Sequence, residues 1–166
     1  RAYLRATING DSDEQQVLTR LNSLLYEDMP VESFLTLILA RIDARSRRFR
    51  YAGAGHNAYL MRPDGEIEDL PSTGLVLGLV DQVELTISEP YAVGTGDLLL
   101  MFSDGLQETM SPESVLFGMD RALDFIRAHR HRSASEILER LYRASREFAG
   151  NNSPEDDVTL VIARFL

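Results

Sequence analysis

Apolar residues recur at intervals of three and four in three stretches of the chain, and each pattern predicts an amphipathic helix. The first stretch follows the polar residues 11–13, which supply a cap and first-turn acids, and predicts a helix over residues 12–27. The second stretch predicts a helix over residues 117–129. Both patterns place their aliphatic side chains on one face, which we expect to be buried.

The third helical stretch carries its own start and stop signals. Ser133 is followed three positions later by Glu136, which is a capping box, and Gly150 marks the end. We expect Leu141 and Tyr142 to lie on the buried face of this helix.

Shorter apolar segments predict a run of strands between the first helix and the other two. Residues 34–43 are rich in aliphatic side chains and predict a strand that is buried on both faces. Residues 83–88 alternate apolar and polar side chains, which predicts a half-buried strand. The other expected strands begin at Phe49 or cover residues 58–61, 67–70, 97–103 and 158–165.

The order of these elements indicates the fold class. A helix, five or six strands joined by short turns, two helices and a final strand are typical of an α+β domain with mostly antiparallel sheets. A length of 166 residues suits a single domain over residues 1–166. No glycine-rich phosphate loop follows a strand, so a nucleotide-binding fold is not supported.

Composition narrows the possible functions. The chain has no cysteine, which excludes disulfides, thiolate metal sites and a cysteine nucleophile. The formal net charge of −9 would repel a phosphate backbone, so we expect no nucleic acid partner. The apolar runs are too short to cross a bilayer, so we expect no membrane segment.

Residues 52–57 form the first candidate for chemistry. Two alanines alternate with two glycines, the second of which is Gly55, and the polar residues His56 and Asn57 follow. Small residues allow the backbone to approach another group closely. The alternative is a bulge or tight turn that holds a hydrogen-bonded histidine.

Residues 102–105 form the second candidate, because an apolar strand ends in Asp104 just before Gly105. A buried aspartate is costly unless a cation or hydrogen-bond donors compensate its charge. The alternative is that Asp104 caps a short helix, since aspartate is a favoured N-cap residue.

Residues 155–159 form the third candidate, because three carboxylates, Glu155, Asp156 and Asp157, precede the last strand. Neighbouring like charges repel unless a positive group lies among them, and hard oxygen ligands suit Mg²⁺ or Mn²⁺. The alternative is a solvated acidic turn.

Taken together and in order, these stretches resemble the PPM (protein phosphatase 2C-like) family, in its SpoIIE-like bacterial branch. The resemblance covers nearly the whole chain and implies a layered α/β-β/α sandwich. The matching segments are residues 34–37, 51–57, 72–75, 77–78, 96–100, 103–106 with Glu108, 117–118 and 156–160.

The resemblance also implies roles for individual residues. Asp104 and Asp156 match metal-binding aspartates of the family and would be the catalytic residues, and Asp157 is a weaker candidate ligand. The residues implied to shape the site are Gly55, His56, Asn57 and Gly105.

The implied activity is that of a metal-dependent protein serine/threonine phosphatase. Two Mn²⁺ or Mg²⁺ ions would bridge a water and direct it at the phosphorus of a phosphoserine or phosphothreonine. In this branch the substrate is a phosphorylated antagonist of an anti-sigma factor, and a sensor or receiver domain precedes the phosphatase domain in the chain. We expect a cytoplasmic location.

One departure from the family concerns an upstream aspartate that follows a glycine on a strand. The only Gly-Asp pairs here are Gly10-Asp11, before a helix, and Gly96-Asp97, at the start of a strand. We therefore expect an N-terminally truncated domain that lacks strands and is a poor catalyst alone. An exposed sheet edge would also favour self-association, for example as a homodimer.

Two functions remain open at this point. One is an active phosphatase domain. The other is a non-catalytic, phosphatase-like docking module for a sigma-factor regulator.

Overall fold

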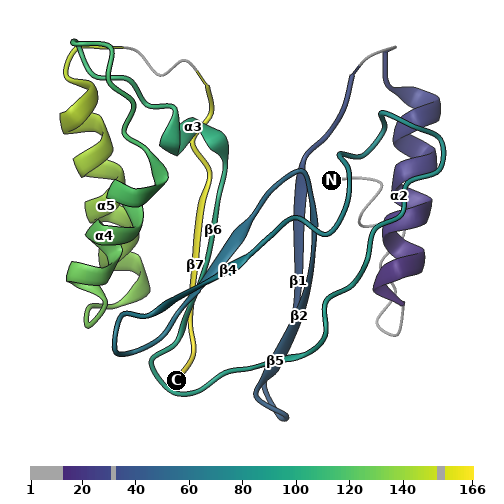
Figure 1. Ribbon diagram of the computed structural model, residues 1–166, viewed down its shortest axis with the longest axis horizontal. Coiled ribbons are helices and arrows are strands. Elements are labelled where there is room, and N and C mark those ends of the chain that lie inside the picture. The colour runs from purple at the N-terminus through teal and green to yellow at the C-terminus, as the bar shows by residue number, and fades with distance from the viewer. Residues whose placement is uncertain (1–12, 31–32, 153–155) are drawn as a thin grey trace. The chain divides into compact units, whose positions relative to one another are not determined.

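The computed structural model describes residues 13–30, 33–152 and 156–166, and it divides into two compact units. Unit 1 comprises Arg1–Asn57 and Pro71–Val93, and unit 2 comprises Ala58–Leu70 and Gly94–Leu166 (Figure 1). The chain thus passes from unit 1 to unit 2 and back before it completes unit 2. One domain over residues 1–166 stays a prediction.

In the part of unit 1 that the structure describes, one helix is combined with a three-stranded antiparallel sheet. Helix α2 (Glu14–Asp28) begins at Asp13, whose side chain accepts a hydrogen bond from the Gln15 N–H at 3.0 Å. The sheet has the order β1-β2-β5. Its strands are β1 (Leu37–Asp43), β2 (Arg48–Ala54) and β5 (Tyr91–Ala92).

The core of unit 1 forms where the apolar stripe of α2 meets the sheet and the loop that follows residue 71. Helical spacing brings Leu18, Leu21 and Leu25 onto one face of α2. The buried partners from the sheet and the loop are Ala52, Ala54, Leu77 and Leu85.

Among its described residues, unit 2 combines a four-stranded antiparallel sheet, in the order β4-β3-β6-β7, with three helices. The strands are β3 (Ala58–Met61), β4 (Ile67–Leu70), β6 (Leu98–Phe102) and β7 (Leu160–Arg164). The helices are α3 (Asp104–Gln107), α4 (Met119–His129) and α5 (Ala134–Ala149).

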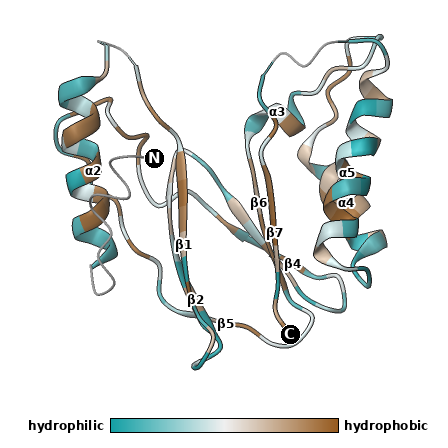
Figure 2. Cartoon of the chain, turned by 180° about the vertical axis from the view of Figure 1, so that it is seen from behind, coloured by the Kyte–Doolittle hydropathy of each residue, from teal (hydrophilic) through white to brown (hydrophobic). Residues whose placement is uncertain are grey.

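The core of unit 2 lies between this sheet and the helices α4 and α5. Figure 2 shows apolar residues concentrated along β6 and β7, while the two helices carry apolar and polar residues on different faces. Leu98, Leu100 and Phe102 of β6 pack with Ile126 of α4 and Ile137 of α5. Because β6 is central and almost wholly buried, it fixes the position of whatever follows its last residue.

The expected α+β class with antiparallel sheets is confirmed, and most element positions agree to within a few residues. The capping box at the start of α5 is also confirmed, since the Ser133 side chain accepts the Glu136 N–H and the Glu136 side chain accepts the Ser133 N–H. The predicted helix over residues 12–27 corresponds to α2, although residue 12 lies outside the described residues.

Three predictions were wrong. Residues 83–88 form no strand, because the segment makes only single backbone hydrogen bonds, such as Ser88 N–H to Tyr51 O at 2.9 Å. Strand β1 is half-buried to exposed rather than buried on both faces. Tyr142 keeps 48% of its surface exposed, because it lies beside the buried stripe of α5 rather than on it.

Candidate active site

The pairing of β6 with β7 brings two acidic segments to one edge of the unit 2 sheet. Phe102 at the end of β6 pairs with Leu160 at the start of β7, and the strands are antiparallel. The residues after Phe102 and those before Leu160 therefore lie at the same edge. Asp104 and the segment Asp156-Asp157 therefore lie at the same edge of this sheet.

Ser103 ties the two segments together. Its N–H donates to the Thr159 carbonyl at 2.9 Å, and its Oγ accepts the Thr159 N–H at 2.8 Å. The same Oγ donates to the Asp157 carbonyl at 3.0 Å. Sequence reasoning missed this role, because a serine beside an aspartate gives no signal of a bond to a residue more than fifty positions away.

Gly105 allows the acidic segment to lie directly against the start of α3. A Cβ atom at this position would lie 2.5 Å from the Asp157 carbonyl oxygen and 3.4 Å from that of Asp156. The first distance is far below van der Waals contact, so only glycine fits without movement of the backbone. The implied role of Gly105 in shaping this edge therefore has a steric basis.

Asp104 lies in the first turn of α3 and is half-buried. The alternative that it caps this helix is wrong, because Ser103 occupies the N-cap position. Oδ1 of Asp104 accepts the Gly105 N–H at 3.2 Å. The expectation of a buried carboxylate is thus met only in part.

Asp156 and Asp157 are both exposed. Oδ1 of Asp156 accepts the Asp157 N–H at 2.7 Å, which is a local turn contact. Within the described residues, no cationic side chain forms an ion pair with Asp104, Asp156 or Asp157. Glu155 lies outside the described residues.

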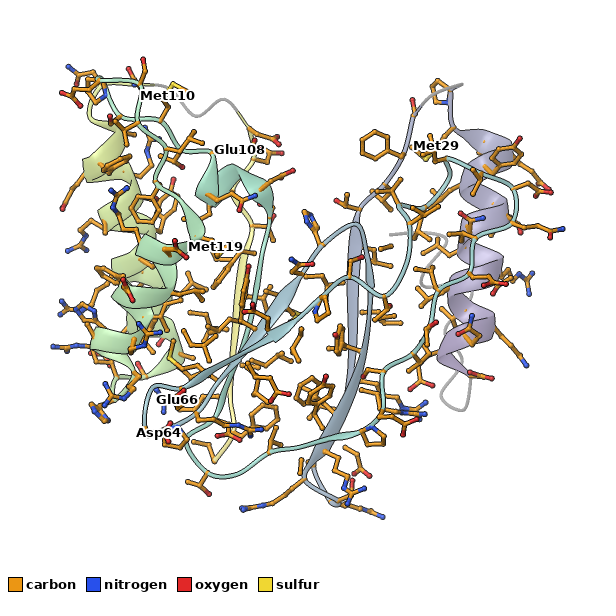
Figure 3. All side chains as sticks on the ribbon, viewed as in Figure 1. Met29, Asp64, Glu66, Glu108, Met110 and Met119 are labelled. Atoms are coloured by element: carbon orange, nitrogen blue, oxygen red, sulfur yellow. The ribbon has the colours of Figure 1, made fainter. Side chains whose placement is uncertain are left out.

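A further carboxylate, Glu108, stands at the C-terminal end of α3 (Figure 3). Its N–H donates to the Asp104 carbonyl at 2.9 Å, which closes the turn that carries Asp104. Figure 3 places Asp64 and Glu66 at the opposite end of unit 2, in the turn between β3 and β4. These two acids therefore serve as reference residues remote from the candidate site.

The donors at this edge agree in type with a hard divalent cation. Carboxylate and carbonyl oxygens suit Mg²⁺ or Mn²⁺, and Mg²⁺ is often held by one or two carboxylates and several waters. Across residues 13–30, 33–152 and 156–166, no group of three or more acidic or histidine side chains converges on a common point. Asp104 and Asp156 therefore agree with such an ion in donor type, and the described residues do not by themselves form a full set of ligands.

The glycine-rich stretch lies in unit 1 and is closed by hydrogen bonds to residues 72–74. Ser72 Oγ donates to the Gly53 and Gly74 carbonyls at 2.8 and 2.9 Å and accepts the Gly55 N–H at 2.9 Å. A Cβ at Gly53 would lie 2.5 Å from the His56 carbonyl oxygen. Gly55 has a φ of +78°, and a Cβ there would meet Val76 at 2.5 Å.

His56 and Asn57 are engaged within the same unit. His56 Nε2 and Thr36 Oγ1 form a hydrogen bond of 2.9 Å, and Asn57 Oδ1 accepts the Ser72 N–H at 2.9 Å. The structure thus shows the tight turn with a hydrogen-bonded histidine that the sequence left open as an alternative.

Of the two Gly-Asp pairs in the sequence, only Gly96-Asp97 lies within the described residues. Asp97 is 3% exposed, pairs with Arg62 at 2.7 Å and accepts the Gly94 N–H at 2.8 Å. Its carboxylate is therefore compensated by the protein itself.

Comparison with solved structures identifies the class of fold. The chain superposes on the SiaA-PP2C domain of Pseudomonas aeruginosa with a TM-score of 0.84 and 22% identity, covering 99% of this chain and 66% of that one. It superposes on the PP2C phosphatase domain of SpoIIE from Bacillus subtilis with a TM-score of 0.77 and 23% identity, covering 99% and 48%. The fold is that of the PP2C-like phosphatase domains.

The family follows from the sequence comparison. The model of the family "Stage II sporulation protein E (SpoIIE)" matches residues 1–166, and the chain belongs to this family. It is 28% identical over 151 residues to the phosphoserine phosphatase RsbU of Bacillus subtilis (strain 168), covering 90% of this chain. The chain spans 44% of the length of that relative.

The length and hydropathy of the helices bear on whether the chain could cross a membrane. In the part of the chain that the structure describes, none combines the length and the apolar character that a membrane span needs.

Proposed function

We propose that this chain is a metal-dependent protein serine/threonine phosphatase domain. The observation that carries the proposal is the meeting of Asp104 with Asp156 at one sheet edge, held by Ser103 and Gly105. Membership of the SpoIIE family and the likeness to a phosphoserine phosphatase support this class of substrate.

In the proposed site, Asp104 and Asp156 hold the cation, and Asp157 is the weaker third candidate. Bound Mn²⁺ or Mg²⁺ would supply an activated water and neutralise charge on the phosphoryl oxygens. The chain's own part is to fix the two carboxylates. The buried strand β6 and the Ser103 contacts hold the backbone of this edge, so only the side chains remain to be ordered on binding.

The proposed substrate is a phosphorylated regulator in a bacterial sigma-factor pathway, of the anti-sigma-factor antagonist type, and the proposed location is the cytoplasm. A sensor or receiver domain in the same polypeptide and a homodimer belong to the same proposal. Within the described residues, the Gly96-Asp97 pair is compensated by Arg62 and offers no counterpart of the upstream aspartate that the resemblance calls for, so we expect slow turnover by these residues alone.

The test is Mn²⁺-dependent hydrolysis of p-nitrophenyl phosphate and of a phosphoserine peptide. We expect Asp104→Asn to lower the rate about 100-fold, as for the loss of a group that stabilises transition-state charge. Asp64→Asn is the matched control, because it makes the same chemical change at the opposite end of unit 2. Equal rates for the two variants would refute the proposal.

A non-catalytic docking module is the second candidate, and one observation favours it. No three-ligand cluster forms among the described residues, and Asp156 and Asp157 are exposed. A docking module would bind its regulator with no dependence on Mn²⁺ and would release no phosphate from it. Measuring both quantities on one sample separates the two functions.

A further inference from the structure

Unit 1 contains a pocket that the proposed phosphatase chemistry does not use. It has a volume of about 480 Å³ and lies on the sheet formed by β1, β2 and β5. Its lining is strongly basic for a chain with a formal net charge of −9. The lining residues are Arg41, Ile42, Asp43, Ser46, Arg48, Phe49, Arg50 and Pro90.

The strand register explains why the arginines gather there. Arg41 of β1 pairs with Arg50 of β2, and Asp43 pairs with Arg48. Alternate residues of a strand point to the same face, so Arg48 and Arg50 share one face while Phe49 between them is buried. Three guanidinium groups thus project from one face of two neighbouring strands.

Two of the three arginines share one acidic partner. Glu14 at the start of α2 pairs with Arg50 at 3.1 Å and with Arg41 at 3.5 Å. Its side chain is 11% exposed, so this single carboxylate is shared by two arginines and is closed to other ligands. Arg41 and Arg50 are therefore both held in place by this one carboxylate.

Asp43, the acidic residue in the lining, already has hydrogen-bond partners within the turn. Asp43 accepts the Arg45 N–H at 2.9 Å and the Ser46 hydroxyl at 2.7 Å, which closes the turn between the two strands. The Arg48 side chain is exposed and makes no hydrogen bond or ion pair with another described residue. Its guanidinium is free to bind an oxyanion in the two-point manner typical of arginine.

We propose that this pocket is a docking site for an acidic segment of a protein partner. Arg48 binds a carboxylate or phosphoryl oxygen of the segment, and Arg41 and Arg50 supply the surrounding positive field. The volume lies in the range of sites that hold several heavy groups rather than one small ion. Pro90 in the lining offers an apolar contact that a peptide can use and a free anion cannot.

Charge argues against the other polyanions. Nucleic acids and anionic membranes contact a wide surface, and a net charge of −9 repels them outside this pocket. A short acidic segment touches only the pocket itself. The inference goes beyond the proposed function and does not depend on it, since binding requires no turnover.

The experiment measures binding of a fluorescein-labelled decapeptide that contains four glutamates, with the glutamine version of the same peptide as the neutral probe. We expect saturable binding of the acidic peptide that weakens with added salt, with amide shifts at residues 41–50 in NMR spectra. Arg48→Gln should weaken binding about tenfold, the loss of one charged contact.

Arg20→Gln is the matched control, because Arg20 is an exposed arginine of unit 1 on α2, away from the pocket. It should bind the peptide like the wild type, and so should Asp104→Asn. Circular dichroism would establish that each variant is folded, and Arg48→Glu should abolish binding altogether. The proposal is overturned if the neutral peptide binds equally well, if Arg48→Gln binds like Arg20→Gln, or if inorganic phosphate binds and the peptide does not.

Discussion

Both units contain a glycine that lets another segment reach the end of a buried strand, but the two contacts differ in what they leave exposed. In unit 1, Gly53 and Gly55 admit residues 72–76, and the Ser72 hydroxyl accepts the Gly55 N–H and shares its single hydrogen between the Gly53 and Gly74 carbonyls. In unit 2, Gly105 admits the segment Asp156-Asp157 and leaves carboxylates with only local partners.

This difference in hydrogen bonding distinguishes a contact that stabilises the fold from one that can bind a ligand. A close approach that ends in satisfied hydrogen bonds stabilises the fold and presents nothing to a ligand. A close approach that concentrates uncompensated negative charge lowers stability unless a cation binds. The acidic edge of unit 2 is therefore the better candidate for a site, although both stretches attract attention in the sequence.

The largest expected effect comes from Gly105→Ala. The added Cβ meets the Asp157 carbonyl oxygen at 2.5 Å, and that backbone atom has little freedom to move. Overpacking of this kind costs about 1–3 kcal/mol, and the better helix propensity of alanine offsets less than about 1 kcal/mol of it. We expect a lower unfolding free energy and weaker Mn²⁺ binding.

Gly94→Ala is the control for that experiment, because a Cβ at Gly94 meets no atom within 4 Å. Its unfolding free energy should stay within about 1 kcal/mol of the wild type. If urea titrations give the same curve for the two variants, Gly105 has no special steric role at this edge.

A medium effect is expected from Ser72→Ala in unit 1. The substitution removes a hydroxyl that donates to Gly53 and Gly74 and accepts from Gly55, which should cost about 1–2 kcal/mol of stability. Mn²⁺ affinity should not change, because Ser72 serves packing alone. A variant of normal stability with weakened Mn²⁺ binding would reverse the comparison between the two units.

The smallest effect concerns pH. The Ser46 hydroxyl, followed by the backbone N–H groups of Arg45 and Ser46, holds the pKa of Asp43 below its usual value. A carboxylate with a lowered folded-state pKa stabilises the fold above its unfolded pKa of about 3.9, and this contribution is lost as the pH falls through the folded pKa. Ser46→Ala should therefore raise the Asp43 pKa in an NMR titration.

Glu136 in unit 2 offers the parallel case. The Ser133 hydroxyl and backbone N–H lower its pKa in the same way, at the start of α5. Ser133→Ala should raise the pKa of Glu136 and leave that of Asp43 where it is. A shift of both groups in either variant would mean that these turns are not independent.

Much of the fold was predictable because its elements are defined by local patterns. The helical spacing that identifies α2, and the Ser133–Glu136 box that starts α5, need no knowledge of the rest of the chain. Residues 83–88 show the limit of such reasoning. The alternation correctly predicts that Leu85 is buried. A strand also needs a neighbouring strand with a free edge, however, and the alternation of residues 83–88 does not show whether such a strand is present.

The candidate site was predictable in its residue types but not in its contacts. The Asp-Gly pair and the acidic run before the last strand both signalled carboxylate chemistry, and the strand order brought them to one edge. The Ser103 bridge could not be foreseen, since it depends on the register of two strands far apart in sequence. The hydrogen bond between His56 and Thr36 could not be predicted from the sequence around His56 either.

The most direct test of the central claim is a double-mutant cycle on Mn²⁺ affinity, measured by calorimetry with Asp104→Asn, Asp156→Asn and the double variant. If both carboxylates hold one ion, each single change weakens binding about tenfold or more, and the double variant loses less than the sum of the two. Asp64→Asn should bind Mn²⁺ like the wild type. If Asp104→Asn behaves like Asp64→Asn, or if the two losses add in full, Asp104 and Asp156 do not share a metal ion.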